Sequence, residues 1–141
     1  MGKFFGTYER TLDEKKRLQV PTKLVREMPR SFFVLRGFEG CLSVYEEDAF
    51  NSLLARMESK DYEDPKQRAY VRAAMSSATE LEVDSHGRIG LTAELTARYG
   101  ITQEVTIIGV LDHFEIWDSA AYAKYQSALP SYEELAAPKA L

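Results

Sequence analysis

A stretch of sequence that occurs twice is the feature that most constrains how this chain can fold. Residues 12–24 read L-D-E-K-K-R-L-Q-V-P-T-K-L, and residues 83–95 read V-D-S-H-G-R-I-G-L-T-A-E-L. At a constant offset of 71, Asp13, Arg17, Leu18, Val20 and Leu24 match Asp84, Arg88, Ile89, Leu91 and Leu95. A D-x-x-x-R that opens the same apolar pattern twice indicates an internal repeat, in which two copies of one structural unit pack together.

The residues around each copy predict the same order of elements: a strand, a polar loop, a strand, a short helix, a β-hairpin and a helix. In the first unit these are Phe4–Thr11, Asp13–Lys16, Arg17–Val20, Thr22–Met28, a hairpin of Phe32–Arg36 and Cys41–Tyr45, and a helix capped by Asp48. In the second unit they are Ala78–Val83, Asp84–Gly87, Arg88–Leu91, a helix capped by Thr92, a hairpin of Val105–Val110 and Phe114–Trp117, and a helix over Ser119–Ala128 capped by Asp118.

The segments outside the two matching stretches also give structural signals. The second halves of the units match at an offset of 72, as Gly37 matches Gly109, which predicts one inserted residue before the second hairpin. A helix that starts at Pro65 connects the units. In the tail, Ser131 and Glu134 form a capping-box pattern.

Neither unit has enough strands to form a stable sheet with a buried face alone. We therefore expect the two units to pack about a pseudo-two-fold axis as one domain, which would place the two polar loops side by side on one surface. The length of 141 residues, with 45% hydrophobic and 28% charged residues, fits a single globular unit.

The net charge of −4 conceals an asymmetry along the chain. Residues 1–36 carry nine basic and four acidic side chains, a charge of +5, whereas the remaining 105 residues carry nine basic and eighteen acidic ones, a charge of −9. A basic end on an acidic body can present one face to a polyanion.

Composition also limits the compartment and the chemistry. The single Cys41 excludes an internal disulfide framework and fits a reducing compartment. No apolar run approaches the roughly 20 residues that cross a bilayer, and residues 1–6 lack the apolar region of a signal peptide. We therefore expect a cytoplasmic protein without a membrane partner.

The repeated loop has two interpretations. In the first, Asp13 and Asp84 accept backbone N–H groups or pair with the arginine that ends each loop, which fixes the turn and does nothing else. In the second, clustered basic side chains bind phosphates, and arginine reads guanine O6 and N7 in the major groove. The basic side chains in or beside the loops are Lys15, Lys16, Arg17, His86 and Arg88.

Several motifs in combination resemble those of the MraZ family, within the AbrB-like swapped-hairpin group of transcription factors. They are F-x-G-T-Y at residues 4–8, D-x-K-x-R-L-x-V-P at 13–21, D-x-x-G-R-I at 84–89 and G-V-x-x-x-F-E-I-W at 109–117. The resemblance runs from about Phe5 to Ala128 and so covers most of the chain.

The resemblance implies an α+β fold. Two tandem AbrB-like β-α-β units would pack about a pseudo-two-fold axis into one small swapped-hairpin, β-barrel-like domain with flanking helices. On this basis we divide the chain into a first repeat (residues 1–58), a connecting helix (59–77), a second repeat (78–128) and a C-terminal tail (129–141).

The resemblance also implies a function. Such a protein would be a sequence-specific regulator of the division and cell-wall gene cluster, bound to short direct repeats in double-stranded promoter DNA. It would associate with the nucleoid and form a homo-oligomeric ring, an octamer or a dodecamer. No catalytic residue, metal, cofactor or small-molecule ligand is implied. By position, the DNA-facing residues are Lys15, Arg17, His86 and Arg88, with Lys16 and Lys3 added from charge and proximity alone, while Asp13, Asp84 and Gly87 shape the loops.

The sequence departs from the family pattern at three positions. Lys16 stands where the first loop has glycine, as Gly87 does in the second, so the first turn is expected to differ if this position needs a positive φ. His86 replaces a basic or amide residue, so we expect weaker or pH-dependent binding by the second loop. Thr92 replaces the proline seen as Pro21, without structural harm, because threonine caps helices well.

Two other classes of function stay open at this point. An enzyme or metal site could use Asp84, His86, Asp112 and His113, but histidines on opposite parts of the repeat unit satisfy no ligand spacing. A protein-interaction module would use its helices and strand edges for oligomerisation, with the loops as turns. The aromatic residues repeat with the fold, which favours core or subunit contacts over a base-stacking platform.

Overall fold

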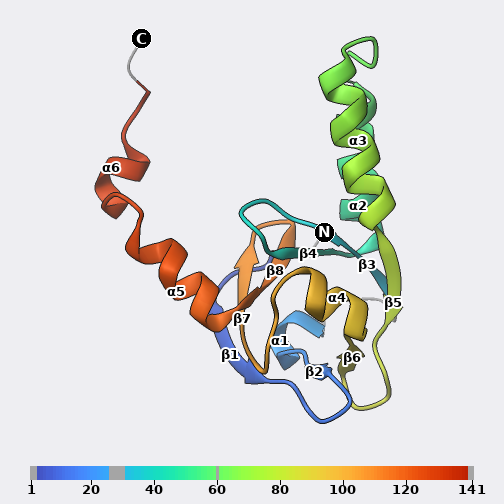
Figure 1. Cartoon of the computed structure of the whole chain (residues 1–141), viewed down its shortest axis with the longest axis vertical. Coiled ribbons are helices and arrows are strands. Elements are labelled where there is room, and N and C mark those ends of the chain that lie inside the picture. Colours follow the sequence, from blue (N-terminus) through green and yellow to red (C-terminus); the bar gives the residue numbers. More distant parts are fainter. Residues whose placement is uncertain (1–2, 26–30, 60, 140–141) are drawn as a thin grey trace.

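The computed structural model describes residues 3–25, 31–59 and 61–139 (Figure 1). Its elements are β1 (Thr7–Thr11), β2 (Arg17–Gln19), α1 (Thr22–Val25), β3 (Ser31–Arg36), β4 (Leu42–Tyr45), α2 (Glu47–Glu58), α3 (Pro65–Ser77), β5 (Thr79–Glu82), β6 (Arg88–Gly90), α4 (Ala93–Arg98), β7 (Glu104–Val110), β8 (His113–Asp118), α5 (Ser119–Ser127) and α6 (Tyr132–Ala136). The predicted α+β class and the repeated order of elements are confirmed. The last three residues of the helix predicted over Thr22–Met28 lie outside the described residues.

The main sheet joins the two units through exchanged strands. It has six antiparallel strands in the order β1-β7-β8-β4-β3-β5. The first strand of each unit pairs with the hairpin of the other unit, β1 with β7 and β5 with β3, while the two hairpins meet through β4 and β8. Neither unit therefore has a complete sheet of its own, as the sequence predicted.

The strand register corrects one detail of the repeat. Tyr8 lies opposite Ile107, and its counterpart Thr79 lies opposite Val34. Ile107 thus corresponds to Val34 at an offset of 73, so the predicted insertion of one residue before the second hairpin is wrong. Two residues are inserted there, and the turn of the second hairpin is one residue shorter, which restores the offset of 72 along β8.

A two-stranded antiparallel ribbon of β2 and β6 forms the second sheet. Leu18 lies opposite Ile89, which is its own counterpart in the repeat, and both side chains are fully buried. Two equivalent hydrogen bonds flank the ribbon: Val20 N–H donates to the Gly87 carbonyl at 3.1 Å, and Leu91 N–H donates to the Lys16 carbonyl at 2.9 Å. The ribbon therefore has the two-fold symmetry that the repeat predicted.

Both units contribute to one main hydrophobic core. Burying a large apolar side chain contributes about 1.5–3 kcal/mol. The largest fully buried apolar side chains are Phe32, Phe114, Leu18, Leu42, Ile89, Ile107 and Ile116. A second cluster lies where α2 and α3 pack on the sheet, and there Phe33 stacks on Phe50 with ring centroids 4.3 Å apart.

All but one of the N-cap residues predicted from the sequence cap their helices in the structure. Thr92 Oγ1 accepts from Leu95 N–H, Asp118 Oδ2 from Ala121 N–H, and Ser131 Oγ from Glu134 N–H. The predicted cap at Asp48 is wrong, because α2 starts directly after β4 with Glu46 as the N-cap. Asp48 lies in the first turn instead, where its negative charge favours the helix dipole.

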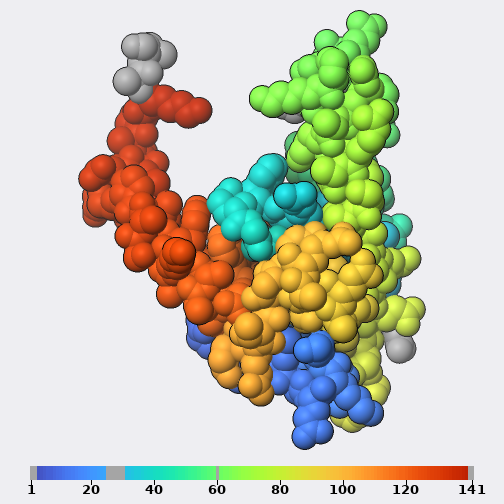
Figure 2. Space-filling model, in the orientation of Figure 1, coloured from blue at the N-terminus to red at the C-terminus, as the bar shows by residue number. Residues whose placement is uncertain are grey.

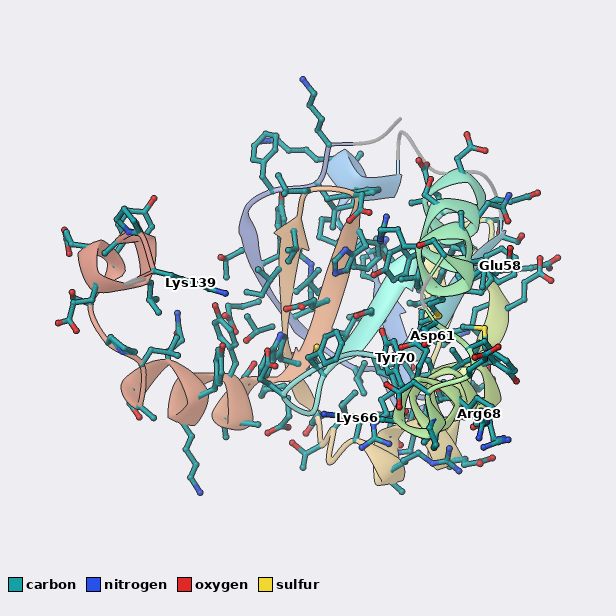
Figure 3. All side chains as sticks on the ribbon, turned by 90° about the horizontal axis from the view of Figure 1, so that it is seen from above. Glu58, Asp61, Lys66, Arg68, Tyr70 and Lys139 are labelled. Atoms are coloured by element: carbon teal, nitrogen blue, oxygen red, sulfur yellow. The ribbon has the colours of Figure 1, made fainter. Side chains whose placement is uncertain are left out.

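Two helical arms leave the body on the side opposite the polar loops. In Figure 1, the arm of α2 and α3 and the arm of α5 and α6 diverge at the top, while the loops before β2 and β6 lie together at the bottom. The space-filling view shows open space between the arms (Figure 2), and the view from above places the arms on opposite sides of the sheet (Figure 3). No helix in the described ranges is long and apolar enough to span a membrane.

The close approach of the N-terminal segment to β7 predicts a strong effect of Gly109→Ala. A Cβ at Gly109 would lie 2.2 Å from the Phe5 nitrogen, whereas a Cβ at Gly90 meets nothing within 4 Å. We expect Gly109→Ala to lower the free energy of unfolding by about 1–3 kcal/mol, as overpacking does, and Gly90→Ala to change it by less than about 0.5 kcal/mol. Urea unfolding followed by circular dichroism measures both, and equal midpoints for the two variants would contradict this account.

Candidate nucleic-acid interface

The loop between β1 and β2 is a tight turn built around one carboxylate. Asp13 N–H donates to the Arg17 carbonyl at 3.1 Å, and Lys16 N–H donates to the Asp13 carbonyl at 3.0 Å. Asp13 Oδ1 accepts from the backbone N–H groups of Lys15 and Arg17 at 2.8 and 2.9 Å, and Oδ2 accepts from Arg17 Nε at 2.6 Å. The aspartate therefore fixes the backbone of the loop and the direction of the arginine side chain.

The loop between β5 and β6 repeats this arrangement bond for bond. Asp84 N–H donates to the Arg88 carbonyl at 2.8 Å, and Gly87 N–H donates to the Asp84 carbonyl at 3.1 Å. Asp84 Oδ1 accepts from the N–H groups of His86 and Arg88 at 2.8 and 2.9 Å, and Oδ2 accepts from Arg88 Nε at 3.0 Å. The two loops thus have the same internal geometry although their middle residues differ.

These hydrogen bonds favour the charged form of both carboxyl groups. The bond from the Arg17 backbone N–H is the largest cause that holds the pKa of Asp13 below its ordinary value of 3.8, and the Arg17 side chain and the Lys15 N–H add to it. The Arg88 backbone N–H lowers the pKa of Asp84 in the same way. Each loop is therefore held by a permanent anion at neutral pH.

Lys16 adopts the backbone conformation of the glycine that it replaces. Its φ is +58°, and the φ of Gly87 is +76°. The expectation that the first turn differs is therefore wrong, because the hydrogen bonds of Asp13 enforce the left-handed conformation at the lysine. For a residue with a Cβ this conformation costs about 1–2 kcal/mol.

The two loops, which lie far apart in the sequence, are in direct contact. Arg88 Nη1 lies 3.9 Å from Asp13 Oδ2, an ion pair that joins one loop to the other. Gln19 Nε2 donates to the carbonyls of His86 and Gly87 at 2.9 and 3.3 Å. Gln19 was not predicted from the sequence, and its counterpart in the repeat, Gly90, cannot make these bonds, so the contact between the loops is asymmetric.

The basic residues of the loops form one exposed surface. Lys15, Lys16 and His86 are exposed, while the side chains of Arg17 and Arg88 keep 35% and 26% of their area accessible. In the described part of the chain, neither arginine donates a hydrogen bond through a terminal guanidinium nitrogen. The structure therefore brings together five of the six predicted basic residues. Among the residues that it describes, it leaves the terminal nitrogens of Arg17 free of hydrogen bonds, and those of Arg88 have only the long ion pair of Nη1 with Asp13.

Lys3 is the one predicted basic residue that lies elsewhere. Its neighbour Phe4 pairs with Leu111 at the turn between β7 and β8, whereas Leu12, which leads into the first loop, donates to Gln103 at the other end of β7. The two ends of such a strand are about 25 Å apart at roughly 3.4 Å per residue. Lys3 is thus not part of the loop surface.

The residues considered for an enzyme or a metal site do not converge. His113 Nδ1 pairs with Asp112 Oδ1 at 2.8 Å and its ring stacks on Tyr45, at the other hairpin end, while Asp84 and His86 lie in the loop. Burial raises the pKa of the Cys41 thiol. Among the described residues, no group of three His, Cys, Asp or Glu side chains could hold a metal ion.

The match to known proteins covers both units. The model of the family described as MraZ protein matches residues 3–73 and again residues 74–140. The chain belongs to the MraZ family. Proteins named Transcriptional regulator MraZ are similar to it along nearly their whole length. The one from Heliobacterium modesticaldum is 35% identical over 94% of both chains, and the one from Limosilactobacillus fermentum is 35% identical over 95% of this chain and 94% of its own. The MraZ of Corynebacterium diphtheriae is 37% identical over 87% and 86%.

The lowered pKa values predict how the loops respond to acid. A carboxyl group with a lowered folded pKa stabilises the fold above its unfolded pKa, and this contribution is lost as the pH falls through the folded value. We expect carboxyl carbon NMR titrations of Asp13 and Asp84 to have midpoints below 3.8, with the amide signals of Arg17 and Arg88 shifting together with them. The urea-unfolded chain provides the reference, and midpoints equal to that reference would contradict the hydrogen-bond account.

The positive φ at Lys16 predicts a stabilising substitution. Lys16→Gly removes the cost of the left-handed conformation and adds only the smaller entropic cost of glycine, so the free energy of unfolding should rise by about 0.5–1 kcal/mol. Lys15→Gly is the matched control, since Lys15 has no positive φ and the same change there should destabilise. Thermal unfolding of the two variants checks the sign, and a loss of stability in both would contradict the conformational argument.

Proposed function

We propose that this protein is a sequence-specific DNA-binding transcriptional regulator that contacts promoter DNA with its two D-x-x-x-R loops. The observation that carries the proposal is the meeting of Arg17 and Arg88 at one end of the molecule, each held by an aspartate through Nε. The names of the relatives support the regulatory role.

The geometry of the arginines fits direct reading of bases. Because Asp13 and Asp84 occupy Nε, the terminal nitrogens of each guanidinium can donate to two acceptors, as guanine O6 and N7 require in the major groove. Side chains that are already ordered lose less entropy on binding. The narrow antiparallel ribbon of β2 and β6 between the loops is of the kind that the major groove admits.

The two loops differ in net charge, so we expect them to contribute differently to DNA binding. Residues 13–17 carry three basic and two acidic side chains, whereas residues 84–88 carry one of each when His86 is neutral. Lys15 and Lys16 therefore supply most of the attraction to phosphates, and Lys16 adds its charge where Gly87 has none. His86 stands in the second loop at the position of Lys15 in the first, so we expect the second loop to bind DNA more weakly.

The asymmetry of the loops fits direct repeats. A symmetric pair of reading elements binds a palindrome, since each half reads the same sequence. Here Lys15, Lys16 and Gln19 correspond in the repeat to His86, Gly87 and Gly90, so one protomer reads a site without two-fold symmetry. Several protomers in one assembly then read several copies of that site in the same direction.

The remaining features of the proposal follow the family. The exchange of first strands between the units supports the swapped-hairpin arrangement that we propose for this fold. We propose a ring of identical subunits, association with the nucleoid, and the promoter of the division and cell-wall gene cluster as the target. No catalytic step is proposed.

The test is a fluorescence anisotropy titration with a promoter duplex that contains the direct repeats, against a shuffled duplex. We expect Arg17→Ala and Arg88→Ala each to weaken specific binding about 10- to 100-fold, since a bidentate base contact contributes about 1–3 kcal/mol. Arg72→Ala is the matched control, because Arg72 is an exposed arginine on α3, which lies away from the loops (Figure 1), and it should bind as wild type.

Two further measurements separate base reading from charge. Affinity should fall steeply with salt, and each variant that loses a phosphate contact should reduce the slope by about 1. Arg17→Lys keeps the charge but not the fork, so it should recover non-specific binding and not the preference for the promoter duplex. If the Arg17 and Arg88 alanine variants both bind like wild type at every salt concentration, the loops are structural turns and the proposal is wrong.

A further inference from the structure

The C-terminal helix α6 is folded but has no buried residue. It has only five residues, and isolated helices shorter than about 12–15 residues are marginal in water. Tyr132 and Leu135, three residues apart and therefore on one face, are 82% and 55% exposed. A short helix with an exposed apolar face needs a packing partner, and no described residue of the chain buries this face of α6.

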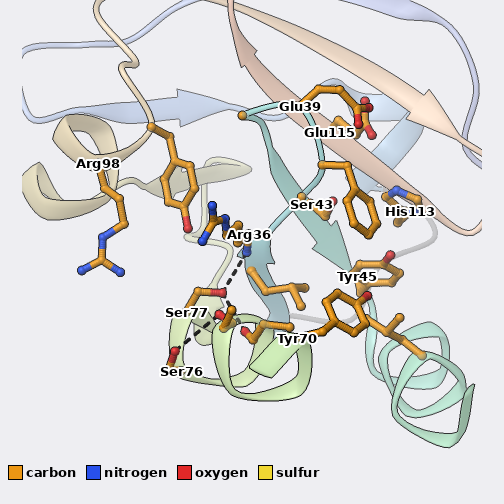
Figure 4. A pocket seen from close by; sticks show the side chains of 18 of the residues that line it. Arg36, Glu39, Ser43, Tyr45, Tyr70, Ser76, Ser77, Arg98, His113 and Glu115 are labelled. Atoms are coloured by element: carbon orange, nitrogen blue, oxygen red, sulfur yellow. Dashed lines mark hydrogen bonds between the residues drawn. The ribbon is translucent and has the colours of Figure 1, made fainter. Parts of the chain in front are cut away.

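A groove of suitable character lies at the base of the other arm. It has a volume of about 920 Å³ and is lined by α2, α3, α4, the turn between β3 and β4, and β8; we call it the arm groove (Figure 4). Phe38 and Tyr70 stack across it with centroids 6.2 Å apart, although they are 66% and 37% exposed. Tyr45 and His113 stack deeper in the groove, at 4.6 Å, and burial raises the pKa of Tyr45 to about 12, so the phenol stays neutral.

The charges of α6 and of α3 are complementary, and the α3 residues that line the groove itself are uncharged. Helix α3 contains Lys66, Arg68 and Arg72 and no acidic residue, whereas residues 131–137, which include α6, contain Glu133 and Glu134 and no basic residue. Lys66 is four residues before Tyr70 and therefore shares its face of α3, and in Figure 3 Lys66 and Arg68 point to different sides. Within the described residues, Lys66, Glu133 and Glu134 form no ion pair.

We propose that α6 of one copy of this chain docks in the arm groove of a second copy, with Tyr132 and Leu135 against Phe38 and Tyr70 and with the glutamates beside Lys66. This is the mode in which an amphipathic helix lays anchors three or four residues apart into an apolar groove. The proposal rests on the homo-oligomer of the proposed function and names its contact. Each copy has one α6 and one arm groove. The contact runs head to tail, from the α6 of one copy to the groove of the next, and a rotation that closes makes a ring that satisfies every copy.

The test uses the full chain and measures its mass by multi-angle light scattering. The wild type should have a mass several-fold above the 16.0 kDa of one chain. The arm variant Tyr132→Ala/Leu135→Ala and the groove variant Lys66→Glu/Tyr70→Ala should each fall to the mass of one chain. Tyr62→Ala is the control, because Tyr62 is an aromatic residue of similar exposure, at 59%, that does not line the groove. Circular dichroism verifies that all variants are folded.

Mixing the two defective variants tests whether the α6 of one copy binds the arm groove of another. The arm variant keeps an intact groove and the groove variant keeps an intact arm, so a one-to-one mixture should form dimers of about twice the mass of one chain and nothing larger. A wild type that is a monomer, an arm variant with the wild-type mass, or a mixture that stays monomeric would each overturn the proposal.

Binding to DNA is read separately, so that the two proposals can fail independently. The arm variant should still bind a duplex with one copy of the repeat, with an affinity that Arg17→Ala lowers. Loss of loop-dependent binding in the wild type would contradict the proposed function without affecting the mass measurements. Unchanged mass in the arm variant would contradict the docking of α6 without affecting the loops.

Discussion

Leu18 and Ile89 lie opposite each other in the ribbon, each facing its own counterpart in the repeat, and the placement of both loops follows from this pairing. A second pair of counterparts, Ser43 and Glu115, lies opposite each other where β4 meets β8. The pseudo-two-fold axis therefore passes through the ribbon and the centre of the sheet. A slip of one residue would turn Leu18 and Ile89 towards solvent and would also separate the carbonyls of Lys16 and Gly87 from their partners across the ribbon.

The carboxylate in each loop gives order at the expense of net charge. Asp13 and Asp84 fix the arginines, yet they also cancel the charge that would attract a phosphate backbone. An interface of this kind favours selection among sequences over tight general binding, because the phosphate attraction does not depend on sequence. Weak contacts of one protomer become effective when several are linked, since the later contacts are intramolecular. The proposed assembly would thus compensate for the low net charge of each pair of loops.

The sequence predicted those parts of the structure that depend on local chemistry. The D-x-x-x-R repeat placed both loops, and capping residues such as Thr92 and Ser131 placed helix starts, because each acts within a few residues. The pairing of β1 with β7 and of β5 with β3 could not be read in this way, since a strand sequence does not identify its partner. The prediction that Asp48 caps α2 failed because each of the three consecutive acidic residues 46–48 could cap a helix. Strand β4 ends directly before the first of them, so the helix starts there.

The candidate surface was predictable to a similar extent and for similar reasons. The proximity of the residues inside the repeated loops was predictable, because an internal repeat implies a two-fold arrangement of its copies. Lys3 did not join them, because its nearness in sequence to β1 says nothing about which end of the strand it occupies. The role of Gln19 was not predictable because it depends on contacts across the ribbon, although its mismatch with Gly90 is a visible break in the repeat. The conformation of Lys16 could not be predicted from the cost of a positive φ alone, because the hydrogen bonds of Asp13 enforce it.

The arrangement of the two ends of the molecule connects its proposed contacts. The loops lie at one end of the body and the arms at the other (Figure 1), so a contact made by the arms does not cover the loops. A two-fold symmetric contact between copies would turn alternate loop pairs in opposite directions and would call for palindromic sites. A head-to-tail contact of α6 with the arm groove repeats each loop pair in one direction around the assembly. Direct repeats in DNA require loop pairs that all point in one direction, as this contact would arrange them. The loops and the arms are both asymmetric because the two halves of the protomer resemble each other but are not equal.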